Sequence, residues 1–159
     1  VSWARDVYKR QDKLPRHVNL AFRVMLATGL RVSEVANLRR KDVFQNEGAV
    51  FLKVRHGKGK KERIVPVIDA LVARELLSLP TEGFGVTPGT LKAYAHDIKK
   101  AIGIDFHSHR LRHTFATRLL AQGVPLDVVQ KVLGHSNIST TRVYAETLPE
   151  AITRLAAKV

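Results

Sequence analysis

Two segments of the chain carry side chains whose types and spacing could act on an anionic substrate. Arg31 follows the glycine of a Thr-Gly-Leu-Arg turn, and Glu34 lies three residues later, where it could pair with the arginine or orient it. His109 and Arg112 are also three residues apart, so both would project from one side of a helix. This pair would suit an anion at a helix start, where unpaired backbone N–H groups and the helix dipole also act.

A cluster of basic residues provides a third candidate. Its members are Lys53, Arg55, Lys58, Lys60, Lys61 and Arg63. The glycines that flank Lys58 predict a tight hairpin turn, and a basic tip could reach a groove or a phosphate of a nucleic acid. A solvated surface explains the same run of charge equally well.

The fourth candidate is the segment from Gly134 to Tyr144, in which Tyr144 follows His135 by nine residues. A lone tyrosine usually packs with its hydroxyl at the surface, but that explains less well a tyrosine after a Gly-His-Ser turn in a basic chain. A metal site built from His107, His109, His113 and His135 is an alternative. We expect no metal, because no carboxylate or thiolate lies at ligand spacing and the intervening arginine would repel a cation.

The composition indicates a folded basic domain. The chain has 159 residues, with 27 Lys+Arg against 14 Asp+Glu and a formal net charge of +13. A hydrophobic content of 45% excludes a disordered polycation, and the lack of cysteine excludes disulfides and thiolate metal sites. No apolar run approaches the roughly 20 residues of a membrane helix. Nucleic acid is therefore the expected partner, with an anionic membrane surface as the weaker alternative.

The elements that must position these residues are mainly α-helical, with a small antiparallel β-hairpin or sheet. Apolar spacing and glycine caps predict one helix from Pro15 to Gly29 and a short one over Ser33–Leu38. The predicted strands are Ala49–Arg55 and Arg63–Val67. The remaining predicted helices are Asp69–Leu79, Thr90–Ile102, His109–Gln122, Pro125–Leu133, a short one near Thr140–Ala145, and Pro149–Val159. At the C-terminal end, one apolar stripe is formed by Leu148, Ile152, Leu155 and Val159.

Residues 1–11 fit poorly with the rest of the chain. Asp6–Gln11 back-translates, with permitted codons, to a transposase mosaic-end adapter used in library preparation. We therefore interpret 1–11 as a cloning or assembly scar, with a short native linker as the alternative. The expected domain is 12–159, and the chain is then a fragment that lacks its natural N-terminus.

Taken in order, these segments resemble the catalytic domain of the tyrosine recombinases, the phage integrase family. The resemblance rests on Thr28-Gly29-Leu30-Arg31 with Glu34, on Gly57-Lys58-Gly59, on His109 to Arg112, on Gly134-His135 and on Tyr144. It runs from about Leu14 to Ala145. Two departures are the lack of the family's usual N-terminal core-binding domain and a short Pro80–Gly89 connection.

The resemblance implies site-specific recombination of double-stranded DNA through a covalent 3′-phosphotyrosyl intermediate, without metal, ATP or another cofactor. The protein would then act as the integrase or resolvase of a mobile element or phage. Arg31 and Arg112 would hold the phosphate oxygens and Tyr144 would attack phosphorus. Lys58 would protonate the leaving 5′ oxygen. The remaining implied roles are His109 as general base or phosphate hydrogen-bonder, His135 as a second phosphate donor, Glu34 as a support, and Lys53, Arg55, Lys60, Lys61 and Arg63 as DNA contacts.

The resemblance also implies a tetrameric assembly of the full-length protein on DNA and a cytoplasmic, nucleoid-associated location in a bacterium or phage host. The C-terminal stripe could dock on a neighbouring protomer or close the chain's own core. Two other function classes remain: a non-catalytic helix-turn-helix DNA-binding module, which would leave Arg31 and Lys58 unexplained, and a type IB topoisomerase.

Overall fold

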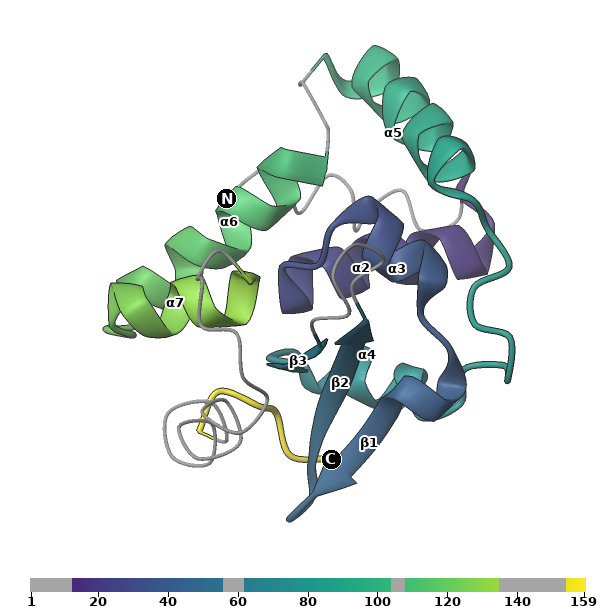
Figure 1. Cartoon of the computed structure of the whole chain (residues 1–159). Helices are drawn as coiled ribbons and strands as arrows, with labels where there is room; N and C mark the ends of the chain where they lie inside the picture. The colour runs from purple at the N-terminus through teal and green to yellow at the C-terminus, as the bar shows by residue number, and fades with distance from the viewer. Residues whose placement is uncertain (1–12, 56–61, 104–107, 135–153) are drawn as a thin grey trace.

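The computed structural model describes residues 13–55, 62–103, 108–134 and 154–159. A small three-stranded sheet lies at one end of the molecule, and most of the helices lie to one side of it (Figure 1). The elements in chain order are α2 (Arg16–Thr28), α3 (Val32–Asn37), the 3-10 helix η2 (Arg40–Asp42), β1 (Val43–Asn46), β2 (Ala49–Arg55), β3 (Glu62–Pro66), α4 (Ala70–Leu76), α5 (Pro88–Ile102), α6 (Ser108–Ala121) and α7 (Leu126–Leu133). No helix in these described ranges is both long and apolar enough to span a membrane.

Helix α2 lies at the centre of the core and packs against α3, α4 and α6. Phe22 of α2 and Leu111 and Phe115 of α6 are at most 2% exposed. The predicted apolar spacing of both helices therefore does mark the faces that meet. This packing fixes the start of α6 next to the end of α2.

Local signals start and stop the helices where the sequence predicts them, to within one turn. The Asp69 carboxylate accepts from the Val72 N–H (3.0 Å) at the start of α4. The Thr87 hydroxyl accepts from the Thr90 N–H (3.1 Å) and Pro88 occupies the first turn of α5. The helix predicted over Asp69–Leu79 ends earlier, at Leu76.

The sheet has the order β1-β2-β3, with both pairs antiparallel. Strand β2 matches the prediction and β3 begins one residue early, but β1 was not predicted. β1 has four residues and exposes Gln45 and Asn46, so no apolar alternation marks it. Glu47 and Gly48 have positive φ angles of 52° and 81° and form the tight turn from β1 to β2.

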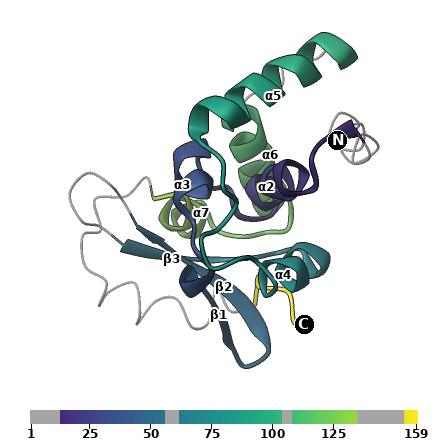
Figure 2. The ribbon, with the colours of Figure 1, turned by 90° about the vertical axis from the view of Figure 1, so that its right-hand side faces the viewer.

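The predicted helix over Pro149–Val159 is wrong in its last six residues. Arg154–Val159 form a turn and then an extended segment whose Lys158 pairs with Ala49 of β2. The Ala157 and Val159 N–H groups donate to the Val67 and Gly48 carbonyls, both at 2.9 Å. This end of the chain lies beside the sheet (Figure 2).

The reason for this extended end lies in the register of the sheet. β3 leaves β2 at the Phe51–Pro66 pair, so the start of β2 has open backbone groups on that side, which the C-terminal residues fill. Val159 is 42% exposed, so it does not continue a buried stripe. Leu148, Ile152 and the helix predicted over Thr140–Ala145 lie outside the described residues.

Candidate active site

The turn between α2 and α3 positions the first pair of predicted site residues. Gly29 ends α2 with a φ of 73°, and a Cβ atom there would lie 2.5 Å from the Phe115 ring, so α6 packs directly on the turn. Arg31 is the N-cap of α3, and its backbone N–H donates to Glu34 Oε1 (2.8 Å). The predicted link between Arg31 and Glu34 therefore exists, through the arginine's backbone.

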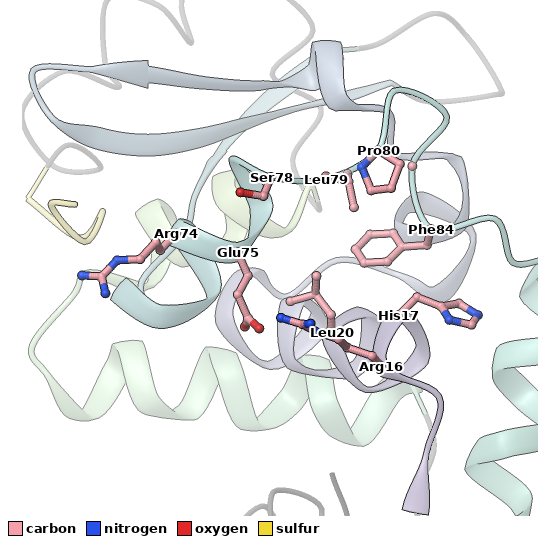
Figure 3. A pocket seen from close by; sticks show the side chains of 10 residues that line it. Arg16, His17, Leu20, Arg74, Glu75, Ser78, Leu79, Pro80 and Phe84 are labelled. Atoms are coloured by element: carbon pink, nitrogen blue, oxygen red, sulfur yellow. The ribbon is translucent and has the colours of Figure 1, made fainter. Parts of the chain in front are cut away.

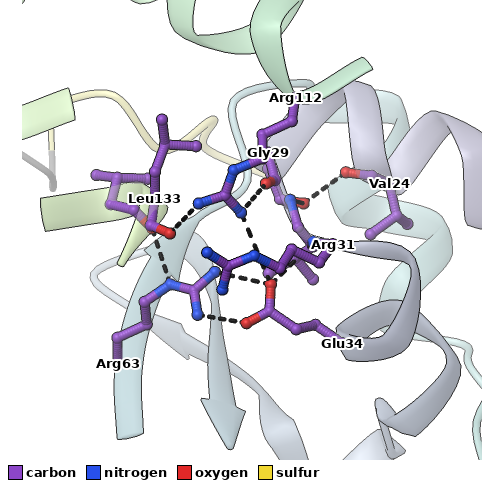
Figure 4. A network of polar contacts seen from close by, with 10 residues as sticks. Val24, Gly29, Arg31, Glu34, Arg63, Arg112 and Leu133 are labelled. Carbon is purple, nitrogen blue, oxygen red and sulfur yellow. Dashed lines mark hydrogen bonds and ion pairs between the residues drawn. The ribbon is translucent and has the colours of Figure 1, made fainter. Parts of the chain in front are cut away.

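Arg63 of β3 is the principal partner of the buried Glu34 carboxylate (Figure 4). Its Nη1 and Nη2 atoms donate to Glu34 Oε2 and Oε1, the latter at 3.0 Å. Its Nε donates to the Val132 carbonyl (2.9 Å), which joins β3 to the last turn of α7. All of its contacts lie inside the protein, where only 7% of the residue is exposed.

Arg112 enters the same cluster from the second turn of α6. Its Nη1 donates to the Gly29 carbonyl (3.1 Å) and its Nη2 to the Leu133 carbonyl. These carbonyls terminate α2 and α7, where the negative ends of the helix dipoles favour a cation. Glu34 Oε1 lies 3.9 Å from Nη1, so the carboxylate is near Arg112 but is held by Arg63.

Among the described residues the charges of the cluster are unequal, because three guanidinium groups, those of Arg31, Arg63 and Arg112, surround one carboxylate, that of Glu34. Burial alone would raise the pKa of Glu34, but the hydrogen bonds and charge of Arg63, together with Arg31, lower it below its ordinary value. Burial and the charges of Arg31 and Arg63 lower the pKa of Arg112 to about 10. Arg112 is still charged at neutral pH, so the cluster attracts an anion.

Several predicted site residues lie outside the described ranges: Lys58, Lys60, Lys61, His135 and Tyr144. His109 lies in the first turn of α6, but its side chain is outside the described part. The structure does describe the residues that adjoin these ranges. Arg63 closely follows residues 56–61 in the sequence and Gly134 directly precedes His135, so the described chain next to both ranges reaches the Glu34 cluster.

The predicted DNA-contacting residues divide between the two faces of the hairpin. Lys53 and Arg55 are exposed on β2 and form ion pairs at 3.2 Å, Lys53 with Glu62 at the surface and Arg55 with the buried Asp42. Arg63 is a correction, because it lies opposite Val54 in the register and so points to the buried face. Its guanidinium is occupied by Glu34 and Val132, and we withdraw it as a DNA contact.

A pocket of about 760 Å³ lies elsewhere, between the start of α2 and the end of α4 (Figure 3). Its lining includes Arg16, His17, Glu75 and Phe84 but no member of the Glu34 cluster. The cluster of charged side chains around Glu34, rather than this pocket, is therefore the candidate site.

Comparisons with known proteins show the family to which the chain is similar. Residues 5–150 match the sequence model of the phage integrase family. A tyrosine recombinase of Pseudothermotoga lettingae is 41% identical over 135 residues, which cover 77% of this chain and 46% of that protein. The chain spans about half the length of the curated relatives it matches.

Two solved structures extend the likeness to the fold. The catalytic core of lambda integrase superposes with a TM-score of 0.62 at 25% identity, covering 82% of this chain and 86% of that one. A lambda integrase tetramer bound to a Holliday junction gives a TM-score of 0.64 at 25% identity, covering 85% of this chain and 45% of that one.

Proposed function

Because the chain belongs to the phage integrase family, we propose that it cleaves and rejoins DNA strands at specific sites through a covalent 3′-phosphotyrosyl intermediate. The observation that carries this proposal is the cluster of three arginines around the buried Glu34 carboxylate, with Arg63 and Arg112 within ion-pair distance of it and Arg31 acting through its charge and its backbone N–H. Such an excess of positive charge suits a phosphodiester whose negative charge grows during the reaction.

In this proposal Arg31 and Arg112 bind the two non-bridging oxygens of the scissile phosphate. The pentacoordinate transition state carries more charge on these oxygens than the ground state, so fixed guanidinium groups stabilise it preferentially. The carbonyls of Gly29 and Leu133 hold the Arg112 guanidinium in place before DNA arrives. This preorganisation avoids reorienting the charge during the reaction.

The remaining roles rest on the family motifs. The Tyr144 oxygen forms a bond to phosphorus while the bond to the 5′ oxygen breaks. His109 accepts the phenolic proton, Lys58 supplies a proton to the departing 5′ oxygen, and His135 donates a hydrogen bond to the phosphate. A 5′ hydroxyl of another strand reverses the step, because the phosphotyrosine conserves the free energy of the original bond.

Double-stranded DNA is the proposed partner, contacted by Lys53, Arg55, Lys60 and Lys61. Lys53 and Arg55 support this role because both lie on the exposed face of β2. We also propose that the full-length protein assembles as a tetramer on DNA, by analogy with the lambda integrase tetramer bound to a Holliday junction.

The test uses a pool of nicked duplexes of random sequence, because a nick next to the cleavage point lets the short product diffuse away and traps the adduct. The wild-type chain should retain DNA covalently after denaturation, in excess EDTA. Tyr144→Phe should abolish the adduct and keep non-covalent binding, whereas Tyr94→Phe on α5 should leave both unchanged. Binding without any adduct from the wild type would instead favour the helix-turn-helix module.

A further inference from the structure

Arg63 is the one arginine of the Glu34 cluster for which the proposed function has no use. It makes two hydrogen bonds to Glu34 and one to the Val132 carbonyl. Its side chain is only 8% exposed, so solvent does not compete for its donors. A buried arginine with this many partners inside a phosphate site affects the site's charge and geometry.

The first consequence concerns the charge available to a phosphate. Glu34 Oε1 is 3.9 Å from Arg112 Nη1, close enough to pair with it after a small movement. Arg63 binds both carboxylate oxygens and so competes for Glu34. Without Arg63, the cluster would lose one positive charge and Glu34 would turn to Arg112.

The second consequence concerns geometry. The Nε of Arg63 holds the last turn of α7, and a Cβ atom on Gly134 would lie 3.2 Å from Arg63 Cδ and Nε. Arg63 therefore lies directly under the glycine that precedes His135. It also lies on β3, which follows residues 56–61 in the sequence, so one side chain connects α3, β3 and α7.

We propose that Arg63 is a positioning residue for strand cleavage: it holds the Glu34 carboxylate and the end of α7, so that Arg112 and Arg31 direct their charge at the scissile phosphate. This inference deepens the proposed function and rests on it. Arg63 itself touches no DNA.

The test measures the binding of inorganic phosphate through the Nε–H NMR signal of Arg112, which needs no DNA. Arg63→Met should weaken phosphate binding about tenfold, within the roughly 2- to 150-fold range of couplings in one charge network. Arg63→Met combined with Glu34→Gln should recover wild-type affinity to within about threefold, because it restores the net charge of the cluster. Arg63→Lys keeps that charge and should retain most of the affinity.

Two controls separate this role from a general loss of stability. The double variant replaces a buried ion pair by a neutral pair, so it folds even where Arg63→Met does not. Arg23→Met removes an equally buried arginine of another Arg–Glu pair, outside the site, and should leave phosphate affinity unchanged. Failure of the double variant to recover affinity, or equal losses in Arg63→Lys and Arg63→Met, would overturn the inference.

The adduct assay then separates this inference from the proposed function. Adduct formation should be slowed in the same order of variants as phosphate affinity. A wild-type chain that forms the adduct no faster than Arg63→Met would overturn the role of Arg63 and leave the proposed function intact. A wild-type chain that forms no adduct would overturn the proposed function, and the phosphate affinities would still decide what Arg63 does.

Discussion

Two arginine–glutamate pairs in this chain, each with a buried arginine, have nearly the same local geometry and different surroundings. Arg23 of α2 donates from Nη1 and Nη2 to the two oxygens of Glu75, the latter at 3.1 Å, and Arg63 does the same to Glu34. Arg23 also donates to Asn19 Oδ1 (2.7 Å), much as Arg63 donates to Val132. The hydrogen bonds within each pair therefore do not show which of the two belongs to a functional site.

The charges around each pair make the difference. Arg23 and Glu75 pair one to one and connect α2 to α4, and the described residues add no second ion pair to Glu75. Around Glu34, Arg31 and Arg112 bring two further guanidinium groups to the same carboxylate, as far as the described residues show. A balanced pair contributes to the fold, whereas an unbalanced cluster has charge left for a ligand.

The largest expected effect is on the rate of adduct formation, which should depend on the Glu34 cluster and not on the Arg23–Glu75 pair. Arg112→Met should lower the rate of adduct formation about 10²–10³-fold, the usual cost of removing one preorganised donor to a transition-state oxyanion. Arg23→Met should leave that rate unchanged at temperatures where the variant is folded. A single-turnover trapping assay measures both rates, and similar losses in the two variants would contradict the distinction.

Arg23→Met should lower the free energy of unfolding even though it leaves the rate of adduct formation unchanged. Removing the guanidinium leaves the Glu75 carboxylate without its partner. Glu75 is 25% exposed, so we expect a loss of about 2 kcal/mol, below the roughly 3–5 kcal/mol of a fully buried pair. Urea unfolding measures this loss, and an unchanged midpoint would show that the pair does not hold α2 to α4.

A pair of glycine variants tests the contact between Arg63 and α7. Gly123 and Gly134 both have positive φ, at 85° and 77°, but only at Gly134 would a Cβ atom meet a side chain, that of Arg63. Gly123→Ala should cost about 1 kcal/mol of backbone strain, and Gly134→Ala about 2 kcal/mol. Gly134→Ala should also slow adduct formation, and equal rates in the two variants would argue against the contact.

The smallest expected effect is a difference in unfolding free energy that appears only at acidic pH. The pKa of Glu34 is lowered in the folded chain, so its contribution to stability is complete above its ordinary value of 4.5 and is lost as pH falls through the folded value. Glu34→Gln has no such carboxylate. Its unfolding free energy should therefore fall less steeply than that of the wild type below pH 4.5, and parallel curves would contradict the paired state of Glu34.

The sequence by itself determined the features that depend on neighbouring residues. The end of α2 at Gly29, the cap of α4 at Asp69 and the link between Arg31 and Glu34 each need contacts within about one helical turn. Apolar periodicity also predicted most of the helices and the hairpin strand Ala49–Arg55. The ordered motifs were sufficient to place the chain in its family.

The tertiary structure decided the contacts between distant residues. Arg63 lies 29 residues from Glu34, and its direction depends on the register with Val54, which no local spacing reveals. Likewise, the extended segment at Ala157–Val159 depends on where β3 leaves β2. Local patterns fix hydrogen bonds within a turn, but only packing decides which buried carboxylate a distant guanidinium reaches, because burial removes the water that would otherwise satisfy both.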